Sequence, residues 1–160
     1  MLKDRFRKFL PVVVDLETGG FDANKNPILE IAIQLIDHEG GKLVLGASHR
    51  HHIEPFEGLE INQESIDFLN LDLNHPLRVA DDEKTALLNL FTIINKHKNF
   101  YECSRAILVG HNAFFDHSFL LAACERNSIK KSPFHPFSLI DTVSLGVLAT
   151  QQTVLARICK

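Results

Sequence analysis

The sequence predicts an α/β fold: a mixed central sheet that contains an antiparallel three-strand meander and is flanked by helices. Residues 12–14, 28–37 and 43–53 have strand patterns and follow one another along the chain. A helical spacing of apolar residues begins after residues 81–82, and a short buried strand at 106–109 leads into a second helix. This order, three meander strands and then helix, strand and helix, is typical of a mixed sheet with helices packed on it.

The first strand ends in two acidic residues. Residues 12–14 are all valine, which favours a buried strand, and Asp15 and Glu17 follow with one residue between them. Because residues i and i+2 of an extended chain point to the same side, the two carboxylates are expected side by side. Such close like charges repel unless a cation lies between them, and Mg²⁺ is typically bound by one or two carboxylates together with waters and substrate phosphates. The same stretch also fits a strand that ends in a solvated acidic turn.

The second and third strands complete the predicted meander. Apolar and polar residues alternate along 28–37, and residues 38–41 contain the two glycines of a turn. The third strand, 43–53, carries three histidines, which we interpret as the polar face of a strand rather than as a metal site: His49, His51 and His52.

The next elements bring a third carboxylate towards the first two. Asn62 is expected to cap a short helix through Phe68, and residues 81–82 to open a longer helix. The buried strand 106–109 is followed by a short turn to Asp116 and then by a helix. Because the ends of the strands gather at one edge of such a sheet, Asp116 is expected to lie near the acidic pair. Three carboxylates at one place indicate a metal site.

The C-terminal part of the chain is predicted to contain a loop and two helices. Residues 133–137 include two prolines and are expected to form a loop. Asp141 is expected to begin a helix, and residues 153–160 to begin another that has not ended at the last residue. Since no strand is expected here, the predicted sheet has four strands, the three of the meander and the one at 106–109.

The composition fits one globular domain that spans residues 1–160. The chain is 45% hydrophobic and 23% charged, and its formal net charge of −3 argues against coating nucleic acid through bulk charge. Three cysteines without CxxC spacing indicate free thiols and hence a cytoplasmic location. No apolar run reaches membrane-spanning length and the N-terminus carries no apolar signal segment, so no membrane partner is expected.

Two short motifs of this chain resemble those of known exonucleases. Residues 14–18, VDLET, resemble the first exonuclease motif of the DEDD superfamily, and residues 112–116, NAFFD, resemble the second. Further stretches resemble the ribonuclease T family in the same order along the chain: residues 4–7, 52–56, 111–119, 133–137 and 152–155. Nearly the whole chain thus resembles ribonuclease T, a family of DEDDh-type 3′–5′ exonucleases with a ribonuclease H-like exonuclease fold.

The resemblance implies an enzyme that trims the 3′ ends of tRNA and other stable RNA by two-metal-ion phosphodiester hydrolysis. It assigns Asp15, Glu17 and Asp116 as catalytic residues and as ligands of two Mg²⁺ ions, with Mn²⁺ as an alternative metal. Asp141 matches an Asp-Thr pair that supports such sites, although capping its own helix is the simpler role.

The resemblance also implies how RNA is held. Four phenylalanines match those that stack on terminal bases: Phe21, Phe68, Phe115 and Phe137. Four basic residues match the surface that holds the body of the RNA: Arg5, Arg7, Arg105 and Lys130. The expected partners are RNA with a single-stranded 3′ end, single-stranded DNA as a second substrate, and a second copy of the chain in a homodimer.

The chain departs from the family in one respect. The third motif, a histidine followed five residues later by an aspartate on a C-terminal helix, is not found here, and His111 and His117 are weak candidates for the general base it supplies. We therefore expect an incomplete domain with weak or no activity. The alternatives are a related DNA proofreading exonuclease and a non-catalytic remnant that binds nucleic acid or dimerises.

Overall fold

The computed structural model describes residues 1–55 and 57–160. Phe56, which belongs to one of the stretches that resemble ribonuclease T, lies outside the described residues. Two short 3₁₀ turns open the chain: η1 (Leu2–Asp4) and η2 (Phe6–Lys8). The strands of the described part are β1 (Phe9–Thr18), β2 (Ile28–Glu39), β3 (Lys42–Ile53), β4 (Ala80–Asp81), β5 (Arg105–Gly110) and β6 (Phe134–Asp141). Its helices are α1 (Gln63–Leu69), α2 (Glu83–Phe100), α3 (Ala113–Arg126), α4 (Thr142–Thr150) and α5 (Leu155–Ile158).

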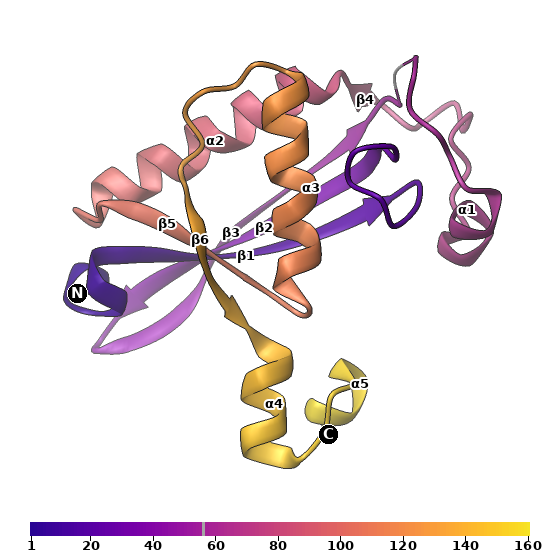
Figure 1. The fold of residues 1–160 in the computed structure, drawn as a ribbon. Helices are drawn as coiled ribbons and strands as arrows, with labels where there is room; N and C mark the ends of the chain where they lie inside the picture. The colour runs from indigo at the N-terminus through magenta and orange to yellow at the C-terminus, as the bar shows by residue number, and fades with distance from the viewer. Residues whose placement is uncertain (56) are drawn as a thin grey trace.

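The strands form one mixed sheet in the order β4-β3-β2-β1-β5-β6 (Figure 1). β1, β2 and β3 pair antiparallel to one another, while β5 runs parallel to β1 and β6 runs parallel to β5. The predicted α/β fold with a three-strand meander is therefore confirmed. Strand β1 lies inside the sheet, between the antiparallel strand β2 and the parallel strand β5, so both of its neighbours fix its position.

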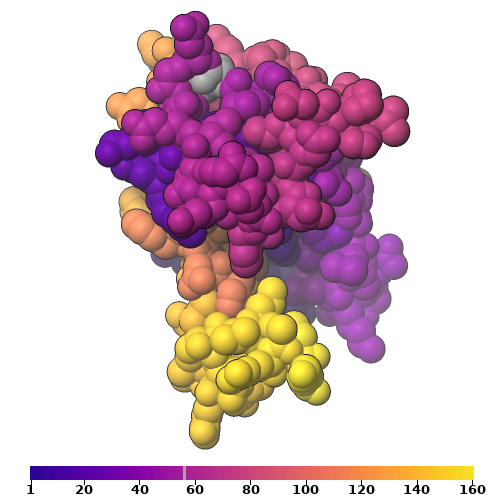
Figure 2. Space-filling view, turned by 90° about the vertical axis from the view of Figure 1, so that its right-hand side faces the viewer, coloured from indigo at the N-terminus to yellow at the C-terminus, as the bar shows by residue number. Residues whose placement is uncertain are grey.

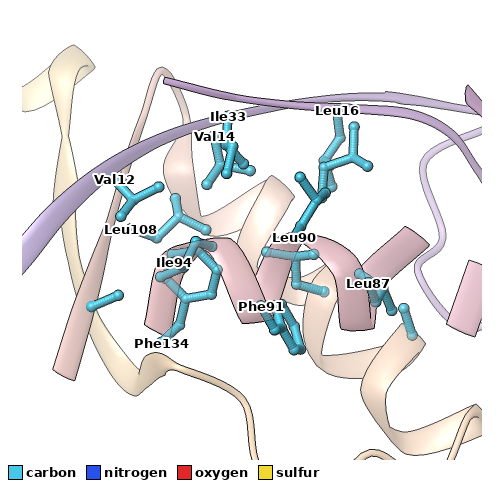
Figure 3. Packing of buried hydrophobic residues seen from close by; sticks show 14 of the residues in the cluster. Val12, Val14, Leu16, Ile33, Leu87, Leu90, Phe91, Ile94, Leu108 and Phe134 are labelled. Atoms are coloured by element: carbon cyan, nitrogen blue, oxygen red, sulfur yellow. The ribbon is translucent and has the colours of Figure 1, made fainter. Parts of the chain in front are cut away.

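Helices α2 and α3 cover one face of this sheet (Figure 1). Alternate residues of β1, namely Val12, Val14 and Leu16, point to these helices and are buried, whereas Asp15 is exposed on the opposite face. Apolar residues of α2 and of neighbouring strands fill the space between the layers (Figure 3): Ile33, Leu87, Leu90, Phe91, Ile94, Leu108 and Phe134. Full burial of each such side chain contributes about 1.5–3 kcal/mol. This core holds β1, and with it the acidic residues, in place.

The predicted helix starts are confirmed by their capping hydrogen bonds. The Asn62 side chain accepts from the backbone amide of Glu64 at 2.8 Å at the start of α1, and Asp82 accepts from Thr85 at 3.0 Å at the start of α2. Each cap satisfies a backbone N–H that has no partner within the helix. The polar residues in front of the apolar patterns are therefore a sound signal for these boundaries.

The prediction of a loop at 133–137 is wrong, because residues 134–137 belong to strand β6. Two prolines favour a break, but β6 lies at the edge of the sheet, where a missing N–H costs little. The pairing of β5 with β6 shifts between Ala106 and Leu108, and this irregularity lies opposite the segment that contains Pro136. The two-residue strand β4 was also not predicted.

Two further boundaries differ from the prediction. Asp116 lies in the first turn of α3, which already begins at Ala113, rather than in the turn before it. Within 153–160 only Leu155–Ile158 is helical. Helices α4 and α5 extend away from the sheet (Figures 1 and 2). In the part of the chain that the structure describes, no helix is both long and apolar enough to span a membrane.

Candidate active site

The three predicted carboxylates come together where β1 meets the start of α3. The backbone amide of Leu16, between Asp15 and Glu17, donates a hydrogen bond to Asp116 Oδ1 at 3.1 Å. Asp116 is only 5% exposed. A Cβ on Gly110, at the end of β5 before the turn to α3, would lie 3.3 Å from Ala113 Cα and 3.4 Å from the Val14 carbonyl oxygen, so the turn passes close to β1.

The charges of these carboxylates act on one another. Burial raises the pKa of Asp116 to about 7, and the negative charges of Asp15 and Glu17 add to the rise. The pKa of Glu17 is also raised, first by burial and then by the charges of Asp15 and Glu30, while Arg50 opposes the rise. A cluster of carboxylates that raise one another's pKa values is stabilised by a bound cation.

The donor set suits a hard divalent cation that shares its ligands with a substrate. Within residues 1–55 and 57–160, no three His, Cys, Asp or Glu side chains are close enough to enclose a metal ion. Mg²⁺, however, is usually held by one or two carboxylates and by phosphate oxygens of the substrate rather than by a complete protein cage. Asp15, Glu17 and Asp116 offer only carboxylate oxygens, which fits this mode of binding.

A groove lined by phenylalanines adjoins the acidic cluster. It has a volume of about 360 Å³, and its walls include Glu17, Phe21, Phe68 and Phe115. Phe21 and Phe68 are 84% and 88% exposed, which is unusual for rings of this size, and the rings of Phe21 and Phe115 meet edge to face at 6.3 Å. The loop after β1, helix α1 and the start of α3 lie next to one another on this side of the molecule (Figure 2). An exposed aromatic groove beside carboxylates is suited to binding the bases at the end of a nucleic-acid strand.

Comparison with known proteins agrees with this geometry. The profile of the RNase_T family, described as an exonuclease family, matches residues 12–160. Ribonuclease T of Haemophilus influenzae strain PittGG is 47% identical over 160 residues, covering 99% of this chain and 70% of that protein. Ribonuclease T of Marinobacter nauticus is 48% identical, covering 99% of this chain and 72% of that protein. The chain belongs to the ribonuclease T family of exonucleases.

Solved structures agree on the fold. The product-bound structure of exonuclease I superposes with a TM-score of 0.65 at 14% identity, covering 86% of this chain and 30% of that one. E. coli exonuclease I in complex with a dT13 oligonucleotide gives a TM-score of 0.64 at 13% identity, covering 86% of this chain and 28% of the other. The chain thus spans less than a third of exonuclease I, and the likeness supports an exonuclease fold of the ribonuclease H-like type.

The fourth phenylalanine expected from the ribonuclease T family lies apart from the groove. Phe137 is on strand β6, is 79% exposed and does not line the groove. Its ring meets that of His135 edge to face at 4.5 Å. The structure therefore brings three of the four expected stacking residues to the groove.

The basic residues expected from the ribonuclease T family form two groups. Arg105 and Lys130 line a groove of about 460 Å³ together with Lys98 and Lys131. Arg5 and Arg7 lie in the N-terminal segment instead. Arg5 donates to the Gly41 carbonyl oxygen at 3.3 Å, and the Arg7 guanidinium lies 5.9 Å from the centre of the Phe9 ring. Lys98 and Lys131 were not predicted for this site, although the Lys130–Lys131 pair is visible in the sequence.

The two weak candidates for a general base have structural partners. His111 Nδ1 lies 3.0 Å from Thr142 Oγ1 and its Nε2 lies 2.9 Å from the Thr153 carbonyl oxygen, so its ring connects the start of α3 to the C-terminal segment. His117 is buried, which lowers its pKa, and its Nε2 lies 3.1 Å from the His135 carbonyl oxygen.

Asp141 has the role that the sequence favoured. Its side chain accepts a hydrogen bond from the Val143 amide at 2.8 Å and caps helix α4. The alternative role that the resemblance suggested, support of the metal site, remains a hypothesis.

Two charged residues beside the acidic pair were not predicted. Glu30 pairs with Glu17 across β1 and β2, and the Arg50 guanidinium on β3 lies 2.6 Å from Glu30 Oε2. Arg50 also lines a shallow groove with Asp15 on the open face of the sheet. The relevant signal, the alternation of polar residues in both strands, is present in the sequence, but only the register places these residues beside one another.

Proposed function

We propose that this chain is a divalent-metal-dependent 3′–5′ exoribonuclease that trims the 3′ ends of tRNA and other stable RNA. One observation carries the proposal: Glu17 belongs both to the acidic cluster and to the wall of the phenylalanine groove. Bases held in that groove would place their sugar-phosphate backbone near the carboxylates. The high identity to proteins named ribonuclease T supports RNA as the substrate.

The groove accounts for a preference for single-stranded ends. Phe21 and Phe68 present open ring faces, and stacking on such faces contributes about 1–3 kcal/mol per base without regard to base identity. A base must be unpaired to enter the groove between these rings. Removal of one nucleotide at a time follows if the groove accepts only the last bases of a strand.

The carboxylates would supply the metal site. Asp15, Glu17 and Asp116 would hold Mg²⁺, two ions in the proposed mechanism, with Mn²⁺ as an alternative. A divalent ion at this position would polarise the scissile phosphate and lower the pKa of an attacking water. The protein contributes by holding Asp116 in place through the Leu16 amide, so that the third carboxylate is positioned before the substrate binds.

We further propose that the enzyme acts as a homodimer in the cytoplasm. The basic groove around Arg105 and Lys130 and the phenylalanine groove share no lining residue. A second subunit that brought its basic groove beside the phenylalanine groove of the first would bind the body of the same RNA. The three cysteines are free thiols, which is consistent with a reducing compartment.

The test is trimming of a short single-stranded RNA labelled at its 5′ end, with Mg²⁺ present. The proposal predicts labelled products that shorten progressively from the 3′ end, and resistance of a fully paired blunt duplex. Internal cleavage or shortening from the 5′ end would contradict it. Trimming of DNA without trimming of RNA would favour the DNA exonuclease, and RNA binding without cleavage would favour the non-catalytic remnant.

A further inference from the structure

A buried carboxamide helps attach the loop that carries Phe21 to the segment before α1. Asn26 is only 8% exposed. Its Oδ1 accepts a hydrogen bond from the Asp22 amide at 2.8 Å, within the loop, and its Nδ2 donates to the Glu60 carbonyl oxygen at 2.8 Å. The side chain therefore joins two segments that are 34 positions apart in sequence.

Two backbone hydrogen bonds also join these two segments. The Glu60 amide donates to the Lys25 carbonyl oxygen and the Asn62 amide donates to the Gly19 carbonyl oxygen, both at 2.7 Å. A side chain on Gly20 would collide with the carboxamide of Asn26, so glycine is needed there for the loop to close over it. Asn26 and these two backbone hydrogen bonds together hold the Phe21 loop against the segment that leads into α1.

These hydrogen bonds join the segments that carry the two most exposed rings of the groove. Phe21 follows Gly20 directly, and Phe68 lies on α1, the helix that Asn62 caps. Because both rings are more than four-fifths exposed, packing around them contributes little to their position. Their separation is instead set by the backbone segments that carry them. Those segments are joined by the Asn26 side chain and by the two backbone hydrogen bonds beside it.

We propose that Asn26 is a positioning residue for the 3′-terminal bases, acting by fixing Phe21 and Phe68 at the separation that stacking requires. This inference rests on the proposed function, since it needs single-stranded ends to bind in the groove. The position demands one acceptor and one donor at once, which a carboxamide provides. Aspartate would keep the acceptor for the Asp22 amide but would turn an oxygen towards the Glu60 carbonyl oxygen.

The experiment measures stacking directly and needs no cleavage. A short single-stranded RNA with 2-aminopurine at its 3′ end is titrated with the protein in EDTA, and the quenching of its fluorescence reports stacking on the rings. We expect Asn26→Ala and Asn26→Asp to bind roughly tenfold more weakly, with less quenching at saturation, because a buried hydrogen-bonding group loses its partner. Asn24→Ala is the matched control in the same loop, where the side chain is exposed, and it should bind as the wild type does.

A double-mutant cycle separates positioning from a general structural defect. If Asn26 acts through the rings, Asn26→Asp should have almost no further effect on affinity in a Phe21→Ala, Phe68→Ala background. An equal loss in both backgrounds, or wild-type affinity of both Asn26 variants, would overturn the inference. Should Asn26→Ala fail to fold, Asn26→Asp alone completes the cycle. If the wild type itself does not bind single-stranded 3′ ends, the proposed function fails and this inference fails with it.

Discussion

The hydrogen bond from the Leu16 amide to Asp116 Oδ1 joins two parts of the candidate site that are 100 positions apart in sequence. It connects the strand with Asp15 and Glu17 to the first turn of α3, and its donor lies between the two acidic residues of the strand. The carboxylate of Asp116 is thus fixed by the backbone of β1 itself. This contact explains how the site keeps its third carboxylate despite the charges nearby.

Asp116→Asn should stabilise the metal-free protein at neutral and higher pH. Burial and the acidic pair raise the pKa of Asp116 from 3.8 to about 7, so between these two pH values the folded protein retains a proton that the unfolded chain has released. The favourable contribution of this group is complete below the unfolded pKa and is lost as the pH rises through about 7. Asparagine keeps an oxygen for the Leu16 amide and carries no charge, so its advantage should grow to roughly 2–4 kcal/mol by pH 8.

Urea unfolding in EDTA at pH 5 and pH 8 measures this difference. The advantage of Asp116→Asn should be clearly smaller at pH 5 than at pH 8, because at pH 5 only part of the difference in protonation between the folded and unfolded chains has developed. An advantage that is the same at both values, or that shrinks as the pH rises, would show that the acidic cluster does not act on Asp116 as described.

Phe68→Ala should weaken the binding of single-stranded RNA. Phe68 lines the groove and is almost fully exposed, so its loss removes one stacking face, worth about 1–3 kcal/mol. Fluorescence anisotropy with a labelled RNA in EDTA gives the affinity. Phe100→Ala is a suitable control, because Phe100 is 76% exposed but stands at the end of α2 and does not line the groove. Equal losses in the two variants would argue against the groove as the binding site.

Lys130→Gln should reduce the salt dependence of RNA binding. Lys130 lies in the basic groove with Arg105, and removing one lysine–phosphate interaction lowers the slope of log affinity against log salt by about 0.7 for a single strand. Affinities measured over a series of KCl concentrations give this slope. Lys42→Gln, an exposed position at the start of β3, should leave it unchanged. An unchanged slope in Lys130→Gln would show that Lys130 in this groove does not contact RNA phosphates.

Arg126→Leu should destabilise the fold strongly. Its guanidinium lies 2.7 Å (Nε to Oε2) and 2.5 Å (Nη2 to Oε1) from the carboxylate of Glu83, which is only 3% exposed, and it also donates to the Ala23 carbonyl oxygen. Removing one partner of a buried ion pair leaves an uncompensated charge and costs about 3–5 kcal/mol. Lys25→Ala, which removes an exposed pair with Asp22, should cost less than about 1 kcal/mol. Chemical unfolding that gives similar losses for both would contradict the predicted role of burial.

Local patterns are enough to predict the parts of the site that lie on one element. The two-residue period of a strand places Asp15 and Glu17 on the same face, and the polar caps Asn62 and Asp82 mark helix starts whatever packs around them. The order of the strands predicted that Asp116 lies near this pair, and the motif resemblance agreed, but neither predicted the hydrogen bond that Asp116 accepts from the Leu16 amide.

Contacts between distant segments could not be predicted from the sequence. The pairing of Arg50 with Glu30 depends on the register of β2 and β3, which shifts between Gln34 and Ile36. The segment around Pro136 has the composition of a loop because proline breaks most strands, and only its place at the sheet edge makes a strand acceptable there. The bond from Asn26 to Glu60 likewise appears only when two loops are packed together.

The most direct test of the account is Mg²⁺-dependent trimming of single-stranded RNA by the wild type, by Asp15→Asn and by Asp141→Asn. Asparagine caps helices as well as aspartate does, so Asp141→Asn keeps the helix α4 cap and serves as the matched control. The account predicts weak trimming by the wild type, in line with the low activity expected from the sequence, and equally weak trimming by Asp141→Asn. EDTA should abolish both, and Asp15→Asn should not trim the RNA at all. Equal trimming by Asp15→Asn, or trimming by the wild type in EDTA, would contradict the assignment of the acidic cluster as the catalytic metal site.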